Sequence, residues 1–260
     1  MGNSQLRNPG APQRDVGEPN ESPRQVQDLI DHGIPPAPIA FDGVLVIVGG
    51  GALDVHLLHQ LAAAGAHLVG ADGGGDAIGS AGLVPEAIIG DFDSLLDPAQ
   101  WDARTRLLKV SEQETTDFEK ALYCTQAPVT VGLGMTGKRF DHTLAALDAV
   151  ARHAQQRRII LVDESDIALA VAGSFGFEVE VGARVSVHPL TPVKFARSAG
   201  LKYPLDGIRL APGVRTGTSN EASAVRFSIE PEAGDAGVWL LILERRYLDT
   251  LIAALSSANQ

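Results

Sequence analysis

Two hydrophobic patterns follow one another along the chain. Between residues 44 and 162, short apolar runs alternate with amphipathic stretches, so the pattern predicts strands and helices in turn. Strands that are apolar along their whole length are typical of a parallel sheet covered on both faces, with helices as right-handed crossovers. We therefore predict a three-layer α/β domain with a mostly parallel sheet. Its expected strands are 44–48, 66–71, 87–90, 107–110, 129–133 and 158–162, and its expected helices are 54–64, 117–125 and 141–153.

After about residue 173 the period changes to two. Apolar residues alternate with small or charged ones from Phe175 to Val181, and further short apolar runs lie at 185–187, 225–229 and 238–243. Glycine and proline separate these runs, and no long helix fits between them. This pattern predicts a small C-terminal β-sandwich.

The first 40 residues differ from the rest of the chain. They hold seven of its 15 prolines and few apolar residues, so they cannot bury enough surface to offset the entropy of ordering. We therefore expect a disordered tail at 1–40, an α/β domain at 41–172, a β-sandwich at 173–245 and a C-terminal tail at 246–260. Residues 247–255 of that last tail can form a helix.

The composition excludes several classes of protein. The 260 residues carry 21 Lys and Arg against 32 Asp and Glu, and this net charge of −11 argues against nucleic-acid and anionic-membrane partners. The single cysteine, Cys124, excludes a disulfide framework. No apolar run approaches the roughly 20 residues of a membrane span, and the first 30 residues lack a secretory apolar region. We expect a cytoplasmic protein.

Acidic residues follow the predicted parallel strands. Asp72, Asp91 and Asp93 come directly after strands, and Asp117 and Asp141 begin helices. Since the carboxyl ends of parallel strands meet at one edge, these acids should gather in one crevice. Asp91 and Asp93 stand two residues apart and can offer paired oxygen ligands to Mg²⁺. Solvated turns explain such pairs as well, and Asp117 and Asp141 can simply cap helices.

A basic, glycine-containing loop precedes the last predicted helix of the α/β domain. Gly134 and Gly137 allow close approach of a phosphate, and Lys138, Arg139 and His142 lie beside a helix N-terminus that favours an anion. An ordinary exposed turn is the alternative. The polar segment 217–220 in the β region is compatible with a plain hairpin turn.

Taken in order, these segments resemble the thiamine pyrophosphokinase (thiamine diphosphokinase) family. The resemblance covers about residues 44–243 and rests on segments in both predicted domains. They are Ala71–Gly74, Gly90–Ser94, Thr116–Leu122, Gly137–His142, Ser186–Leu190, Gly200–Leu205 and Thr218–Asn220. Tyr203 stands where tryptophan is common in the family, and Glu112 and Glu114 replace two aspartates.

The resemblance implies an enzyme that transfers a pyrophosphoryl group from ATP to thiamine, giving thiamine diphosphate and AMP. It implies that the α/β domain binds ATP and Mg²⁺ and that the sandwich binds thiamine. It also implies a homodimer with active sites at the subunit interface. By the family pattern, the catalytic acids are Asp72, Asp91, Asp93 and Asp117, the last three of them metal ligands. The ATP residues are Lys138, Arg139, Asp141 and His142, and the thiamine residues are Gln113, Ser219 and Asn220.

Other functions share some of these features. A pyrophosphokinase for another hydroxyalkyl heterocycle, such as a pterin, needs the same acids but a different acceptor pocket, and Ser219 and Asn220 favour thiamine. A non-catalytic nucleotide sensor need not keep every acid. A Mg²⁺-dependent phosphatase needs a dedicated nucleophile motif, which Asp91 to Ser94 alone does not supply. If a carboxylate removes the thiamine hydroxyl proton, Asp72 and Asp117 are both candidates.

Overall fold

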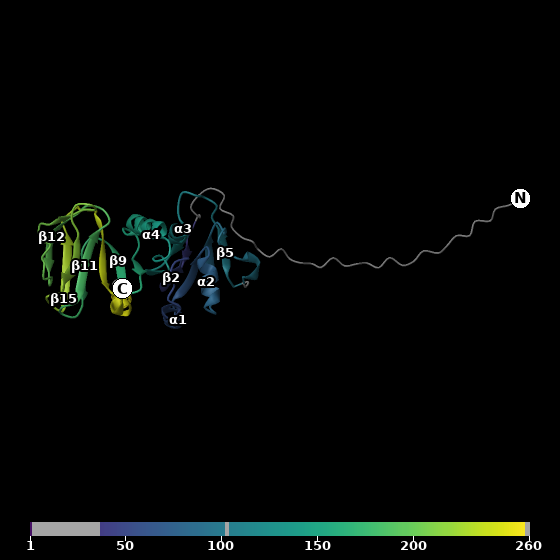
Figure 1. The fold of residues 1–260 in the computed structure, drawn as a ribbon, viewed down its shortest axis with the longest axis horizontal. Coiled ribbons are helices and arrows are strands. Elements are labelled where there is room, and N and C mark those ends of the chain that lie inside the picture. Colours follow the sequence, from purple (N-terminus) through teal and green to yellow (C-terminus); the bar gives the residue numbers. More distant parts are fainter. Residues whose placement is uncertain (2–36, 102–103, 258–260) are drawn as a thin grey trace.

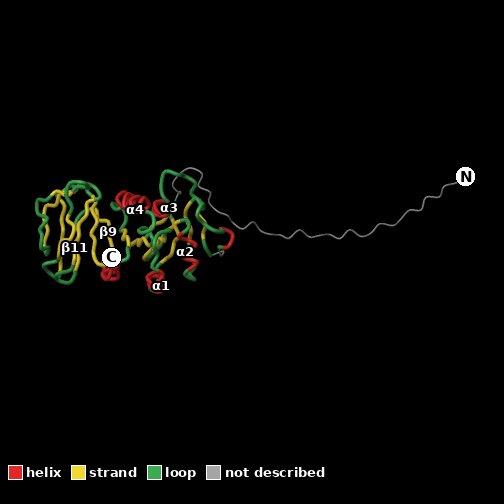
Figure 2. The backbone as a smooth tube through the Cα atoms, in the orientation of Figure 1, coloured by secondary structure: helices red, strands yellow, loops and turns green. Residues whose placement is uncertain are grey.

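The computed structural model describes residue 1 and residues 37–101 and 104–257 (Figures 1 and 2). The expected tail at 1–40 lies mostly outside the described residues. Its last two residues form strand β1 (Ile39–Ala40), which pairs in parallel with β6 (Thr125–Gln126). The ordered chain therefore begins before residue 41.

A ten-stranded sheet runs through the molecule in the order β14-β11-β16-β9-β8-β7-β2-β3-β4-β5. Its six strands from β8 to β5 are parallel to one another, as the sequence predicts. They are β2 (Val44–Val48), β3 (His67–Ala71), β4 (Ala87–Gly90), β5 (Arg106–Lys109), β7 (Val129–Leu133) and β8 (Ile159–Val162). The α/β class is confirmed.

Helices cover both faces of this parallel part. Successive side chains of β2 point to opposite faces. Val46 and Val48 share a core with α1 (Val55–Ala63) and α2 (Gly74–Ser80), whereas Leu45 and Ile47 share one with α3 (Asp117–Cys124) and α4 (Phe140–His153). Helix α5 (Leu248–Ser257) follows a short 3₁₀ turn, η2 (Arg245–Tyr247), and packs on the first face. A second 3₁₀ turn, η1 (Pro98–Gln100), lies between β4 and β5.

The C-terminal strands extend the same sheet and add a second one. Strands β9 (Asp166–Ala172), β16 (Val238–Glu244), β11 (Arg184–Pro189) and β14 (Gly217–Glu221) pair antiparallel beyond β8. The second sheet has the order β10 (Phe175–Glu178), β15 (Arg226–Pro231), β12 (Val193–Ala199) and β13 (Arg209–Leu210). It packs on the first through Phe195 and Trp239, whose buried rings lie 5.7 Å apart.

Two local predictions were wrong, and one helix was not predicted. The helix that was not predicted, α2, begins at Gly74; a Cβ on Gly74 would lie 1.8 Å from the Val48 carbonyl oxygen, so glycine permits this helix to approach the sheet. Asp141 is not an N-cap, because helix α4 is preceded by Arg139 and has no side-chain cap. The segment 217–220 belongs to strand β14 instead of a hairpin turn.

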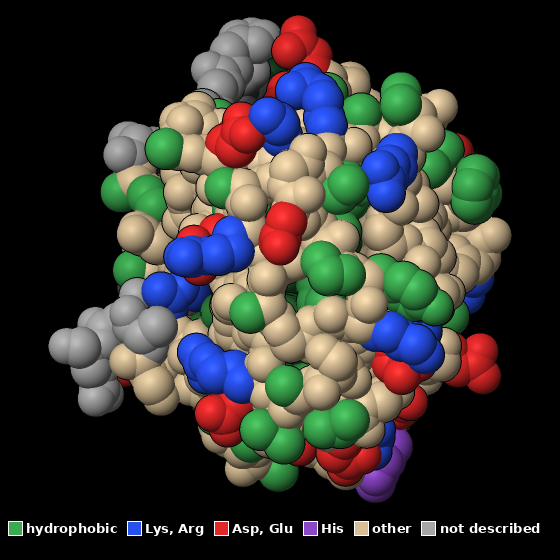
Figure 3. Space-filling model, turned by 90° about the vertical axis from the view of Figure 1, so that its left-hand side faces the viewer, with side chains coloured by type: hydrophobic (Ala, Val, Ile, Leu, Met, Phe, Trp, Pro, Cys, Tyr) green, Lys and Arg blue, Asp and Glu red, His purple; other side chains and the backbone are tan. Residues whose placement is uncertain are grey.

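The outer face of the second sheet carries charges of both signs side by side (Figure 3). Ion pairs across its strands account for several of them, such as Lys194 with Glu232 at 2.6 Å and Arg197 with Glu230 at 2.7 Å. Exposed pairs of this kind contribute little to stability but interrupt any patch of a single sign. Across residues 37–101 and 104–257, every helix is too short or too polar to cross a membrane.

Candidate active site

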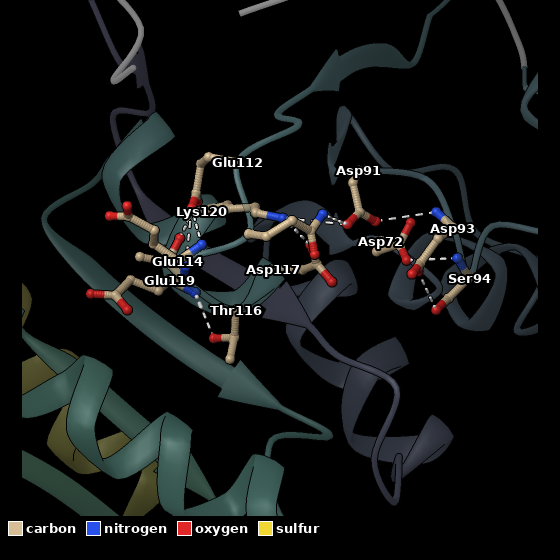
Figure 4. Close-up of polar contacts among 12 residues, drawn as sticks. Asp72, Asp91, Asp93, Ser94, Glu112, Glu114, Thr116, Asp117, Glu119 and Lys120 are labelled. Carbon is tan, nitrogen blue, oxygen red and sulfur yellow. Dashed lines mark hydrogen bonds and ion pairs between the residues drawn. The ribbon is translucent and has the colours of Figure 1, made fainter. Parts of the chain in front are cut away.

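Three aspartates meet at the carboxyl edge of the parallel strands (Figure 4). Asp72 directly follows β3, Asp91 directly follows the neighbouring strand β4, and Asp117 is the first residue of α3. Each offers one carboxylate oxygen, and these oxygens all lie within 4.8 Å of one another. We call Asp72, Asp91 and Asp117 the acidic triad.

The backbone around Asp72 is arranged for this meeting. Asp72 has a φ of +47°, in the left-handed region, and only 2% of its surface is exposed. The Ser94 amide donates to Oδ2 at 2.9 Å, while Oδ1 is buried and has no hydrogen-bond partner among the described residues. A Cβ on Gly90 would lie 2.8 Å from Asp72 Cβ, so only glycine fits beside it.

The pKa values of the triad carboxyls shift in different directions: those of Asp72 and Asp117 are raised and that of Asp91 is lowered. Burial raises the pKa of Asp72 to about 6. The hydrogen bond from the Ser94 amide acts in the opposite direction, and the nearby Asp117 carboxylate raises this pKa further. Burial likewise raises the pKa of Asp117, although Lys120 donates to its Oδ1 at 3.1 Å. The pKa of Asp91 is instead lowered: burial opposes the shift, but Gln113 donates to Oδ2 at 2.7 Å and the Asp93 amide to Oδ1 at 3.2 Å.

The triad has the properties of a site for a hard divalent cation. All its donors are carboxylate oxygens, and one of them, Asp72 Oδ1, is buried and accepts no hydrogen bond from the part of the chain that the structure describes. Mg²⁺ prefers such oxygens and usually completes its coordination with water and substrate phosphates. Asp93 is not one of the three; its Oδ1 accepts the Ser94 hydroxyl at 2.9 Å. Its role as a metal ligand stays a prediction.

A cavity of about 450 Å³ opens beside the triad. Asp72 and Asp117 line it together with Lys138, Arg139 and His142, so the structure brings the predicted phosphate residues to the predicted acids. Glycines 49–51 and 134 complete its wall; a Cβ on Gly51 would lie 2.4 Å from the Gly134 carbonyl oxygen. The two loops can pack this closely only because both have glycine at the contact.

The basic loop is shaped by its own contacts. Lys138 has a φ of +48°, and its ammonium donates to the Gly50 carbonyl at 3.1 Å. Asp141 lies exposed in the first turn of α4 and accepts from Arg139 at 2.6 Å. The Arg139 hydrogen bond, with the His142 amide, lowers the pKa of Asp141 to about 2. Asp141 therefore pairs with Arg139, which lines the cavity, but Asp141 is not itself one of the lining residues.

The predicted thiamine residues do not lie together in this chain. Gln113 contacts Asp91, whereas Ser219 and Asn220 belong to β14, seven strand spacings from β3 in the sheet order. At about 4.8 Å per strand, that separates them from Asp72 by roughly 30 Å or more. Asn220 is buried and occupied: its Oδ1 accepts from the Tyr203 amide at 3.0 Å, and its Nδ2 donates to the Tyr203 carbonyl at 2.8 Å. Asn220 thus holds the exposed Tyr203 loop, and Ser219, with a φ of +58°, presents its side chain to solvent.

Sequence reasoning missed two parts of this site. It did not include Lys120 among the site residues, although this ammonium lies 3.1 Å from Asp117 Oδ1 and 3.7 Å from Asp91 Oδ2. It gave no role to Ser94, whose backbone amide fixes Asp72. Backbone donors carry no sequence signal, but a lysine three residues after a clustered aspartate on one helix face did point toward the site.

Comparison with known proteins agrees with this geometry. Residues 58–162 match the family model described as the thiamin pyrophosphokinase catalytic domain. The chain is 29% identical over 174 residues to thiamin pyrophosphokinase 1 of Caenorhabditis elegans, covering 57% of this chain and 71% of that protein. It is 27% identical over 168 residues to thiamine pyrophosphokinase of Bacillus subtilis, covering 59% and 77%. The crystal structure of thiamin pyrophosphokinase from Geobacillus thermodenitrificans superposes with a TM-score of 0.63 at 25% identity, covering 77% of this chain and 97% of that one.

These matches show that residues 58–162 are similar to the catalytic domain of the thiamine pyrophosphokinase family. The matched catalytic region contains the whole acidic triad, Asp93 and the loop from Lys138 to His142. Ser219 and Asn220 lie outside it. The yeast thiamin pyrophosphokinase structure extends the agreement in fold to 89% of this chain, with a TM-score of 0.63 at 15% identity. The β-rich C-terminal part therefore also belongs to the shared fold.

Proposed function

We infer that this protein is a thiamine diphosphokinase, which transfers a pyrophosphoryl group from ATP to thiamine. The observation that carries this function is the acidic triad beside a basic, glycine-lined cavity, in a chain whose residues 58–162 are similar to the catalytic domain of this family. The hydroxyethyl oxygen of thiamine attacks the β-phosphorus of ATP. A new O–Pβ bond forms, the bond from Pβ to the bridging α,β-oxygen breaks, and that oxygen leaves with AMP. The hydroxyl proton is released.

The residues of the cavity divide the work of binding. Lys138 and Arg139 supply positive charge for the triphosphate. Such local positive charge is needed because the protein as a whole is acidic. The N-terminus of α4 and the backbone of the glycine loops offer further N–H donors. We propose that Asp72, Asp91 and Asp117 hold Mg²⁺, with Asp93 close by. When bound, Mg²⁺ draws charge from the phosphate oxygens as the β-phosphorus is attacked.

We propose that thiamine recognition uses a second subunit. Ser219 and the Tyr203 loop lie at the far end of the sheet from Asp72, too distant to contact one substrate molecule in the same chain. A homodimer that places the C-terminal strands of one subunit against the α/β part of its partner would unite both sets. On this proposal residues 41–172 bind ATP and the metal, and residues 173–245 bind thiamine, in a cytoplasmic enzyme.

The direct test supplies the purified protein with ATP, Mg²⁺ and either thiamine or a hydroxymethyl pterin, and separates the products by chromatography. We expect thiamine diphosphate and AMP from thiamine, and no diphosphorylated pterin. Formation of the diphosphorylated pterin would show that thiamine is the wrong acceptor. Release of phosphate from ATP without transfer would remove the kinase assignment.

A further inference from the structure

Lys120 of α3 is a buried cation that the proposed reaction does not yet use. Its side chain is only 2% exposed. Its ammonium lies 3.1 Å from Asp117 Oδ1 and 3.7 Å from Asp91 Oδ2, and Figure 4 shows the side chain reaching toward these carboxylates. Lys120 therefore lies inside the acidic triad and not on the surface of the helix.

The contact with Asp91 distinguishes this lysine from an ordinary helical ion pair. Asp117 and Lys120 stand three residues apart on one helix, and such a pair on a surface has little energetic effect. Asp91, in contrast, follows β4, so the same ammonium joins the helix to the end of a strand. A buried ammonium is stable only when it is paired, and both its partners here are triad carboxylates.

The triad without a metal is only partly neutralised. Three carboxylates and one ammonium sum to a formal charge of −2. Lys120 occupies oxygens of Asp91 and Asp117, while Asp72 Oδ1 is buried and has no partner among the described residues. Asp72 Oδ1 is thus free to bind a cation, whereas Asp91 and Asp117 already interact with the Lys120 ammonium.

We propose that Lys120 is a built-in counter-ion that positions Asp91 and Asp117 and competes with a free divalent cation for their oxygens. The metal then binds tightly only when it arrives with a triphosphate, whose own oxygens add to those of the triad. This inference rests on the proposed function only in taking the triphosphate to be ATP. It makes Lys120 a positioning residue that sets the order of loading.

The test measures Mn²⁺ binding to the free protein, without nucleotide or thiamine, from the electron paramagnetic resonance signal of unbound Mn²⁺. The titration is carried out at pH 8. We expect Lys120→Met and Lys120→Gln to bind Mn²⁺ at least about tenfold more tightly than wild type, which corresponds to about 1.4 kcal/mol. Lys120→Arg keeps the charge and should restore the weak binding. Lys194→Met, which removes a lysine from an exposed pair with Glu232, is the matched control and should change nothing.

Equal or weaker Mn²⁺ binding by folded Lys120→Met and Lys120→Gln would overturn the proposal. A second measurement needs no variant: wild type should retain Mn²⁺ at least about tenfold more tightly with a non-hydrolysable ATP analogue than without it. Equally tight binding without the analogue also overturns it. Neither titration involves turnover, so a failed thiamine assay and a failed metal prediction are separate results.

Discussion

Replacement of Asp72 by asparagine should stabilise the metal-free protein and inactivate it. Asp72 is buried, its Oδ1 has no hydrogen-bond partner within residues 37–101 and 104–257, and its carboxylate lies close to those of Asp91 and Asp117. Asparagine can keep the bond from the Ser94 amide through its own oxygen, and its NH₂ group can donate toward the neighbouring carboxylates. Asparagine also tolerates the left-handed backbone at this position.

The magnitude follows from the shifted pKa. The pKa of Asp72 rises from 3.8 to about 6 on folding, so the folded state binds more protons than the unfolded state between these pH values. Stability therefore falls as pH rises from about 4 to about 6 and stays lower above that. At about 1.36 kcal/mol per pKa unit, the deficit above pH 6 is at most about 3 kcal/mol. Asp72→Asn should recover much of it and flatten the wild-type decline between pH 4 and 6.

The assay is urea unfolding in EDTA across pH 4–8, followed by circular dichroism. Asp148→Asn, at an exposed position in the middle of α4, is the matched control and should leave both stability and slope unchanged. With metal and substrates present, Asp72→Asn should lose at least about 100-fold in turnover. A variant less stable than wild type at pH 7.5 in EDTA would refute the account of crowded carboxylates.

Three further predictions concern other parts of the molecule. Asp91→Asn should lower kcat at least about 100-fold in a steady-state assay, and unchanged Mg²⁺ dependence would count against its role as a ligand. Ser219→Ala should raise the KM for thiamine about 2- to 13-fold, equivalent to about 0.5–1.5 kcal/mol for one lost hydrogen bond, and leave the KM for ATP unchanged. Asn220→Ala should mainly lower the melting temperature, because it removes the hydrogen bonds to the Tyr203 backbone. The two carboxylates beside His67 raise its pKa, although burial opposes them, so its contribution to stability should be present below pH 6.5 and be lost as pH rises through the raised pKa. His67→Gln should remove that dependence in thermal melts, and an unaltered pH profile would contradict it.

The meeting of the acids was predictable because it depends on a local rule. Asp72 and Asp91 each follow a parallel strand, and neighbouring parallel strands end at the same edge, so their proximity needs no knowledge of the rest of the fold. The start of α3 at Asp117 was likewise marked by Thr116, whose side chain accepts from the Glu119 amide at 3.4 Å.

Features that depend on distant packing were not predictable. The contact between Lys120 and Asp91 arises because α3 lies against the end of β4, and no pattern within either segment specifies that approach. The position of β14 at the far edge of the sheet depends on pairings between strands widely separated in sequence. Helix α2 was not predictable because its glycines disfavour a helix by propensity, whereas the close packing of Gly74 on Val48 and of Gly75 on Ile88 requires them.

The balance of products from one reaction tests the central claim most directly. Phosphorus-31 NMR of the protein with ATP, Mg²⁺ and thiamine follows every phosphate species at once. The account predicts that thiamine diphosphate and AMP appear in equal amounts as ATP disappears, and that Asp91→Asn abolishes both together. Appearance of ADP with thiamine monophosphate, or of AMP with free pyrophosphate and no thiamine ester, would contradict it.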